Sequence, residues 1–222
     1  MVSVAHIQGS IPMAEGSSLT HLSYRSCVDA IEDMLGQNGK NSVLRFAGLE
    51  DLIKDPVDYD PEARVPYEYV TRLFLGVRDL LGNRGYEVIM FRGGIFAVKN
   101  IVEHSEALRN LVAMDFDPVE KLKLGYQAYV RNAGYDPEKT LEYLPEVNQI
   151  VNHRPDCTEC DELLKHKERF ADLVKPSCAF IRGVLQGIGD SFEKELSVSV
   201  VEEMCRLLGD DQCRYRITYR LT

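Results

Sequence analysis

The clearest periodicity in the chain lies near its C-terminal end, where apolar and polar residues alternate. Successive side chains of a strand point to opposite sides, so alternation over residues 196–203 predicts a strand. One face of this segment carries Leu196, Val198, Val200 and Glu202. The alternation returns over residues 213–219, after a polar segment that contains Gly209. The pattern predicts two antiparallel strands joined by a loop.

Helical periodicity dominates much of the remaining chain. Apolar residues recur at helical spacing in several stretches, two of which are followed by Gly36 and Gly82, residues that favour helix ends. The predicted helices cover residues 24–35, 66–81, 105–114, 118–133 and a stretch that begins near residue 179. No internal repeat is visible in the sequence.

Short β-rich runs predict further strands. Residues 43–46 form one such run, and residues 88–91 and 95–98 form two others, separated by Arg-Gly-Gly. Because glycine adopts the positive φ that tight turns need, we expect these two runs to form a hairpin. Residues 141–153 fit neither period well, and we expect a strand there that leads into the first cysteine pair. Residues 1–21 mix Gly, Ser and Pro and are typical of an arm.

Composition narrows the class of protein. The chain carries 26 basic and 35 acidic residues, a net charge of −9 that argues against nucleic acid as a partner. Its apolar runs fall far short of the roughly 20 residues that cross a bilayer, and no export signal precedes them. We therefore expect a cytoplasmic protein that is not an integral membrane protein. The composition and the mixture of helices and strands predict a compact, mixed fold.

The cysteines concentrate the candidate chemistry in the last third of the chain. Cys27 stands alone on the apolar face of a predicted helix and is most simply a core residue. The five others are Cys157, Cys160, Cys178, Cys205 and Cys213. Because the cytosol keeps thiols reduced, cysteines there indicate metal binding, reactivity or burial before they indicate disulfides.

Three potential metal ligands converge at one end of the predicted strand pair. Glu202 is the last inward residue of the first strand, Cys213 is the first inward residue of the second, and Cys205 lies between them. Cys178 precedes a predicted helix and can supply a fourth ligand. Thiolate and carboxylate ligands in a tetrahedral set suit zinc, which would hold the helix to the end of the sheet. We predict zinc as the cofactor.

Other uses of the cysteines stay open. A Cys-x-x-Cys pair, Cys157 and Cys160, can join Cys205 and Cys213 in a rival four-thiolate set that leaves out Cys178 and Glu202. The pair can also serve as a second metal site, as a structural thiol pair, or as a redox dithiol, although no thioredoxin-like context surrounds it. Each thiol alone is also explained by burial.

The C-terminal pattern resembles the 4-vinyl reductase domain family, also described as predicted hydrocarbon-binding proteins. The residues that carry the resemblance are Cys178, Gly183, Gly187, Val200, Glu202, Cys205, Gly209, Cys213 and Ile217. The resemblance covers residues 176–219, is softer back to Gly125, and does not extend into the first 120 residues. In related sensor domains of phenol-responsive activators, zinc is held by one Cys, one Glu and two further Cys, a spacing that Glu202, Cys205 and Cys213 match.

The resemblance implies an α+β fold shared with TRAPP subunits and with haem-based nitric oxide sensors, in which helices pack on a small antiparallel sheet, commonly as a homodimer. It divides the chain into an N-terminal α/β region, residues 1–120, which is the candidate dimerisation part, and a ligand- and metal-binding domain, residues 121–222. It also implies an apolar pocket between helices and sheet, although packing in the core explains each side chain equally well. The candidate pocket residues are Tyr126, Tyr129, Phe180, Val184, Tyr215 and Ile217.

The leading hypothesis is a noncatalytic protein that binds a hydrophobic small molecule or a tetrapyrrole, as a carrier, sensor or assembly factor in photosynthetic pigment synthesis. An alternative is a 4-vinyl reductase of chlorophyll or bacteriochlorophyll biosynthesis. Hydride transfer would need a nicotinamide or flavin, and no Gly-x-Gly-x-x-Gly follows a predicted strand. Four protein ligands would also leave zinc no open position for catalysis. A third hypothesis is a structural adaptor without a ligand.

Overall fold

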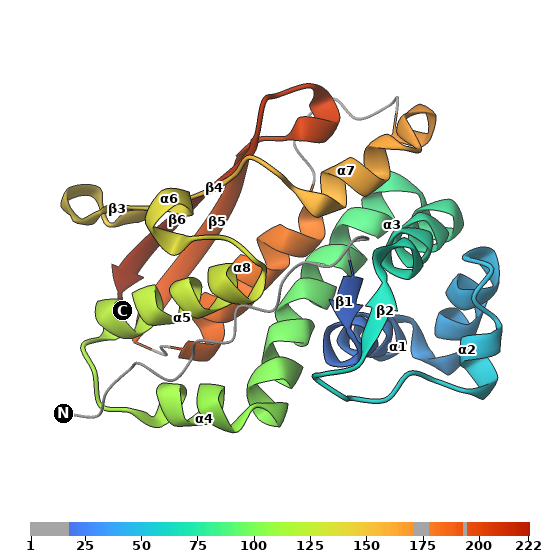
Figure 1. Cartoon of the computed structure of the whole chain (residues 1–222), viewed down its shortest axis with the longest axis horizontal. Coiled ribbons are helices and arrows are strands. Elements are labelled where there is room, and N and C mark those ends of the chain that lie inside the picture. Colours follow the sequence, from blue (N-terminus) through green and yellow to red (C-terminus); the bar gives the residue numbers. More distant parts are fainter. Residues whose placement is uncertain (1–17, 171–177, 193–194) are drawn as a thin grey trace.

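A four-stranded antiparallel sheet forms one layer of the molecule, and helices cover it. The computed structural model describes residues 18–170, 178–192 and 195–222. The strand order is β3-β4-β6-β5, and the sheet lies to the left in Figure 1. The strands are β3 (Leu141–Leu144), β4 (Gln149–Arg154), β5 (Leu196–Met204) and β6 (Cys213–Leu221). The predicted α+β class is confirmed.

Three helices build the framework beside the sheet. They are α1 (His21–Phe46), α3 (Tyr67–His104) and α8 (Ala179–Phe192), and α8 lies between the sheet and α3 (Figure 1). α5 (Pro118–Asn132) packs on α8 as well. The shorter elements are β1 (Ser18–Thr20), α2 (Asp51–Lys54), β2 (Arg64–Pro66), α4 (Glu106–Ala113), α6 (Pro137–Thr140), α7 (Thr158–Leu164) and the 3-10 helices η1 (Pro145–Val147), η2 (Lys167–Phe170) and η3 (Arg206–Leu208).

The apolar side chains form two cores that share α3 and α8. One core lies between the sheet and the helices, and the other lies between α1 and α3. α3 gives Leu75 to the first core and Phe74 to the second, whereas α8 gives Ile181 to the first and Ala179 to the second. The two helices therefore connect the cores. The predicted division of the chain at residue 120 stays a prediction.

α3 and α8 approach each other so closely that their backbones touch at glycines. A methyl group added at Gly94 of α3 would overlap the carbonyl oxygen of Phe180, and one added at Gly183 of α8 would overlap the carbonyl oxygen of Phe91. Only glycine permits this approach, because every other residue carries a Cβ. The contact aligns the two helices and brings the N-terminal end of α8 against the middle of α3.

The glycines of residues 88–98 explain why the predicted hairpin is wrong. This segment lies inside α3, where Gly94 serves close packing with α8 and not a turn. The predicted strand at residues 43–46 is also wrong, because these residues complete α1. In both cases only part of the β-rich run is buried on a helix face, and packing overrides local propensity.

Two glycines that were expected to end helices produce kinks instead. Gly36 interrupts α1 at φ 68° and ψ 173°, and Gly82 interrupts α3 at φ 67° and ψ −179°. This backbone region is open essentially to glycine alone. Each kink has the sequence Leu-Gly-x-x-Gly and is followed four residues after its second glycine by a buried apolar residue, Val43 or Ile89. The chain thus contains two related helix–kink–helix units, although no repeat was expected.

Most of the C-terminal predictions are confirmed. β5 and β6 pair antiparallel, with Val200 opposite Ile217, and α4, α5 and α8 lie where helical periodicity placed them. The ambiguous residues 141–153 form two strands, β3 and β4, separated by a short turn in which Asn148 has φ 54°. The predicted arm falls largely outside the described residues. Within the described part of the chain, no helix has the length and apolarity that crossing a membrane requires.

The α3–α8 contact predicts opposite outcomes for two adjacent glycines. We expect Gly94→Ala to lower the free energy of unfolding by about 1–3 kcal/mol or more, because its Cβ would overlap the α8 backbone. Gly93→Ala is the matched control: its Cβ would lie 3.6 Å from the Cβ of Ala30. Since alanine favours helix, the control should be neutral or up to about 1 kcal/mol more stable. Urea denaturation measures both, and equal effects would contradict the close contact.

Candidate metal centre

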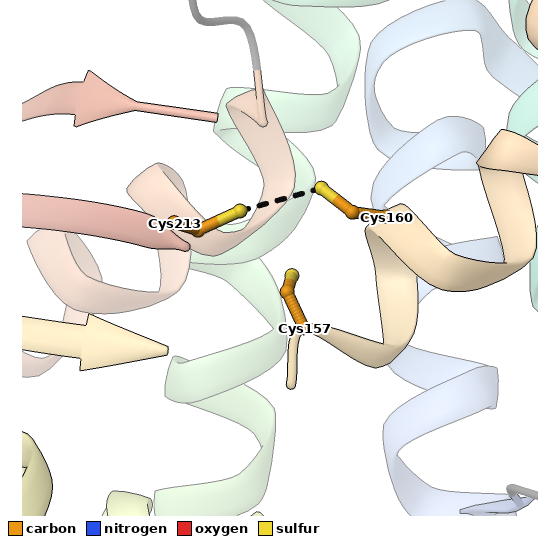
Figure 2. Close-up of side chains that lie close together, drawn as sticks. All are labelled: Cys157, Cys160 and Cys213. Carbon is orange, nitrogen blue, oxygen red and sulfur yellow. Dashed lines mark hydrogen bonds between the residues drawn. The ribbon is translucent and has the colours of Figure 1, made fainter. Parts of the chain in front are cut away.

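Buried thiols from several elements meet at one end of the sheet, where β6 begins and β5 ends. Cys157 immediately precedes α7, Cys160 lies within α7, and Cys213 opens β6. Figure 2 shows these three side chains pointing toward one another. Cys205 lies on the loop between β5 and β6, just before η3. All four cysteines are buried and none forms a disulfide. Four free thiols therefore lie close together at this end of the sheet.

The sulfur atoms lie at distances typical of a shared metal ion. The Sγ of Cys160 is 3.4 Å from that of Cys213 and 4.0 Å from that of Cys205. The Sγ atoms of Cys157, Cys160 and Cys213 all lie within 4.8 Å of one another. Two sulfurs bound to one tetrahedral zinc, each at about 2.3 Å, would be roughly 3.8 Å apart. Small side-chain movements would therefore suffice for all of them to reach an ion.

A second group of potential ligands overlaps the first at Cys213. The ligand atoms of Glu202, Cys205 and Cys213 also lie within 4.8 Å of one another. Glu202 is only 7% exposed, and its Oε1 atom is buried without a hydrogen-bond partner. Its Oε2 atom accepts a hydrogen bond of 2.6 Å from the backbone N–H of Cys178. A carboxylate oxygen buried in this way is a ready position for a cation or a proton.

Local backbone features hold the β5–β6 loop in place. The backbone N–H of Cys205 donates to Asp210 at 2.7 Å, and that of Arg206 donates to the Sγ of Cys213 at 3.5 Å. Gly209 closes the loop at φ 102°, a value that favours glycine. An irregularity in strand pairing between Glu202 and Met204 shifts the end of β5. The loop therefore presents Cys205 and Cys213 from one rigid turn.

Burial and mutual hydrogen bonds shift the pKa values of the clustered groups in different directions. Thiol hydrogen bonds from Cys160 and Cys213 lower the pKa of Cys157 well below its usual value. Hydrogen bonding with the other cysteines raises the pKa of Cys160. Burial, and next the neighbouring Cys205, raise the pKa of Glu202 to about 9. Without a cation, these groups share their protons, because several adjacent anions cannot be buried together.

A buried ion pair beside Cys157 was missed by the sequence reading. The Nη2 of Arg154, at the end of β4, lies 3.4 Å from Oε2 of Glu159 in α7. Their exposed fractions are 4% and 8%. Oε2 of Glu159 is also 3.4 Å from the Sγ of Cys157, and the guanidinium lies 5.2 Å from the ring centroid of Tyr135. The only available signal was that both residues flank Cys157 in the sequence.

The structure places the remaining predicted site residues near this end of the sheet and in the core. Cys178 is partly exposed just before α8. Its sulfur does not belong to either close group found among the described residues. The proposed zinc ligands stay predictions, with Cys205 and Cys213 central to both alternative sets.

The candidate pocket residues pack tightly. Tyr126 is fully buried and donates a hydrogen bond of 2.9 Å from its hydroxyl group to the carbonyl oxygen of Leu185. Tyr215 and Ile217 have no exposed surface either. Phe180 packs against both cores, and its ring centroid is 5.3 Å from that of Phe74. Tyr129 and Val184 belong to the core on the sheet. A role for these residues in ligand binding stays a prediction.

Comparison with known proteins shows the fold. No family model matches the chain, and no curated protein matches it. An H-NOX protein from S. oneidensis in the Fe(II)NO state aligns with 91% of this chain and 99% of its own, with a TM-score of 0.58 and 16% identity. A structure from a study of haem distortion in the H-NOX family aligns with 92% and 95%, with a TM-score of 0.59 and 14% identity.

A third structure, an oxygen-binding H-NOX domain related to soluble guanylate cyclases, covers 91% of this chain and 95% of its own, with a TM-score of 0.55 and 15% identity. The fold of the chain is therefore that of H-NOX domains, and the expected fold of the nitric oxide sensors is confirmed. No match supports the 4-vinyl reductase family specifically. At these identities the likeness establishes the fold alone.

The buried ion pair gives a testable stability difference. We expect Glu159→Gln to lower the free energy of unfolding by roughly 3–5 kcal/mol, because it leaves the guanidinium of Arg154 buried without its anion. Glu120→Gln is the control, since it removes an ion pair with Lys123 in which the Glu120 side chain is 59% exposed; it should cost less than about 1 kcal/mol. Urea denaturation at neutral pH measures both variants. Similar losses would show that the Arg154 pair is not buried in solution.

Proposed function

We propose that this chain is a noncatalytic binding protein for a hydrophobic small molecule, with a structural zinc site at one end of its sheet. The observation that carries the proposal is the buried group of thiols and one carboxylate around Cys205 and Cys213. In the proposal, zinc fixes the β5–β6 loop and the start of α8. These two elements border the apolar core in which the ligand would bind.

The chemistry of the donor groups supports zinc. Thiolates and a carboxylate suit this ion, which is commonly four-coordinate in structural sites. The predicted set is Cys178, Glu202, Cys205 and Cys213, and the hydrogen bond from Cys178 to Glu202 supports a common site. A fully protein-ligated zinc has no open position for water or substrate. A binding role is therefore favoured over the reductase alternative.

The fold supports a ligand between the helices and the sheet. The similar structures include an oxygen-binding H-NOX domain and a structure from a study of haem distortion. In this chain the corresponding interior is apolar and includes aromatic side chains such as Tyr126 and Tyr215. We propose a hydrophobic or aromatic compound held by packing, with a tetrapyrrole as the largest candidate.

A histidine-ligated haem does not fit the described residues. The ring of His104 hydrogen-bonds to the carbonyl oxygen of Asn100 at 2.8 Å and stacks on Tyr59 with centroids 4.7 Å apart. His21 pairs with Asp58, and His153 lies near Glu142 on the sheet. Within residues 18–170, 178–192 and 195–222, no histidine is buried in either core. We therefore propose ligand binding that does not depend on a histidine–iron bond.

The proposal includes a homodimer and a cytoplasmic location. A reducing compartment keeps thiols available for metal, as the six free cysteines require. Carrier, sensor and assembly roles, including roles in pigment synthesis, differ in the partner that receives the ligand.

Native mass spectrometry of the protein purified from its own host tests the proposal directly. We expect zinc together with an apolar compound on each chain, and a mass of two chains per particle. Elemental analysis of the same sample identifies the metal. Zinc without any retained or added ligand would favour the structural adaptor, and protein without metal would remove the main support for the proposal.

Substitutions at two adjacent residues of β5 test where the ligand binds. Val200 faces the core at 9% exposed, whereas Val201 faces outward at 48%. We expect Val200→Phe to weaken binding of a hydrophobic ligand at least tenfold, because the larger side chain occupies apolar space, and Val201→Phe to leave binding unchanged. Ligand titration by fluorescence measures both variants after circular dichroism has shown that they fold. Equal affinities would place the ligand elsewhere.

A further inference from the structure

We propose that the site holds two zinc ions, bridged by the thiolates of Cys205 and Cys213. The inference rests on the proposed function, because one of the ions is its structural zinc. The first ion takes Cys157 and Cys160 as further ligands, and the second takes Cys178 and Glu202. Each of the two alternative ligand sets from the sequence then holds one zinc ion, and Cys205 and Cys213 belong to both sets.

The distances favour shared sulfurs. Cys213 belongs to both close groups of ligand atoms, one with Cys157 and Cys160 and the other with Glu202 and Cys205. Cys205 also lies near the first group, since its Sγ is 4.0 Å from that of Cys160. Both bridging positions are therefore within reach of Cys160 on one side and Glu202 on the other. The sulfur of Cys178 lies outside both close groups, and its backbone N–H contacts Glu202. One ion cannot use all of these groups, because zinc in structural sites takes four ligands.

The number of ligands also agrees with two ions. Five cysteines and one glutamate provide six ligands, and two of these count twice when they bridge. Each zinc then has four protein ligands, the usual tetrahedral number in a closed structural site. A single zinc would leave either Cys157 and Cys160 or Cys178 and Glu202 without a cation.

Protonation distinguishes one ion from two. With one zinc, the cysteines and the carboxylate left without a metal would stay protonated, because buried charges require close counter-charges. With two zinc ions, four positive charges face the six negative charges of the bound ligands, while the guanidinium of Arg154 is already paired with Glu159 beside Cys157. The buried Oε1 of Glu202, which has no hydrogen-bond partner, would then face a cation.

The second carboxylate oxygen of Glu202, Oε2, would not bind the metal. It accepts a hydrogen bond from the backbone N–H of Cys178, the residue that precedes α8. When Oε1 binds the second zinc, the same carboxylate connects the metal pair to the start of this helix. The two ions together would link α7, α8 and the β5–β6 loop, whereas one ion would hold fewer of these elements.

Zinc stoichiometry of the full-length protein tests the inference. Wild-type protein loaded with excess zinc and then desalted should carry two zinc ions per chain in native mass spectra and elemental analysis. The double variant Cys157→Ser/Cys160→Ser should retain one, and Cys178→Ser/Glu202→Gln should also retain one. Cys27→Ser is the control, because Cys27 lies in the other core, and it should retain two.

Cobalt(II) titration of metal-free wild-type protein, refolded at each cobalt concentration because the ligands are buried, avoids any dependence on the folding of variants. Sulfur-to-cobalt charge-transfer absorption should increase up to two equivalents, and X-ray absorption of the zinc form should show zinc–sulfur distances of about 2.3 Å together with a zinc–zinc distance. Saturation at one equivalent would overturn the metal pair and leave the proposed function intact. Absence of any metal binding would overturn both. If both double variants keep the wild-type zinc content, the assigned ligands are wrong.

Discussion

The close approach of α3 and α8 is the constraint on which the other elements depend. The two backbones touch at Gly94 and Gly183, where no larger residue fits. α8 also packs on β5 and α5, so its position relative to α3 sets that of the sheet relative to α1. The two cores are consequently parts of one packed unit. Loss of this contact would separate the helical region from the sheet without changing any hydrogen bond within either.

The candidate metal centre lies where this arrangement brings element ends together. Cys178 precedes α8, Glu202 lies near the end of β5, and Cys213 begins β6. None of these residues is close to another in the chain, apart from those on the β5–β6 loop. Helix packing therefore sets the distance between ligands on different elements, while the loop hydrogen bonds of Cys205 and Arg206 set the local geometry. A bound ion would reinforce contacts that packing has already made.

The sequence was most informative where a local pattern agreed with tertiary packing. Alternation identified β5 and β6 and placed Glu202 and Cys213 at the same end, as the structure has them. The predicted hairpin at residues 88–98 was wrong, because β-rich residues with a Gly-Gly pair are compatible both with a hairpin and with a closely packed helix. The approach of Cys157 and Cys160 to the other thiols depends on the path of α7, and the pair of Arg154 with Glu159 depends on burial; neither has a periodic signal.

The depth of the cysteines has a consequence for the order of events in folding. Cys157 and Cys213 have no exposed surface, and Cys160 and Cys205 are each 2% exposed. An ion in bulk water cannot reach such ligands while the native packing is intact, so entry and exit require a local opening of the structure. The rate of metal exchange would then report the opening of α7 or the β5–β6 loop and not the intrinsic affinity of the thiolates. Metal acquired while the chain folds would stay kinetically trapped, even when competing chelators bind it more tightly.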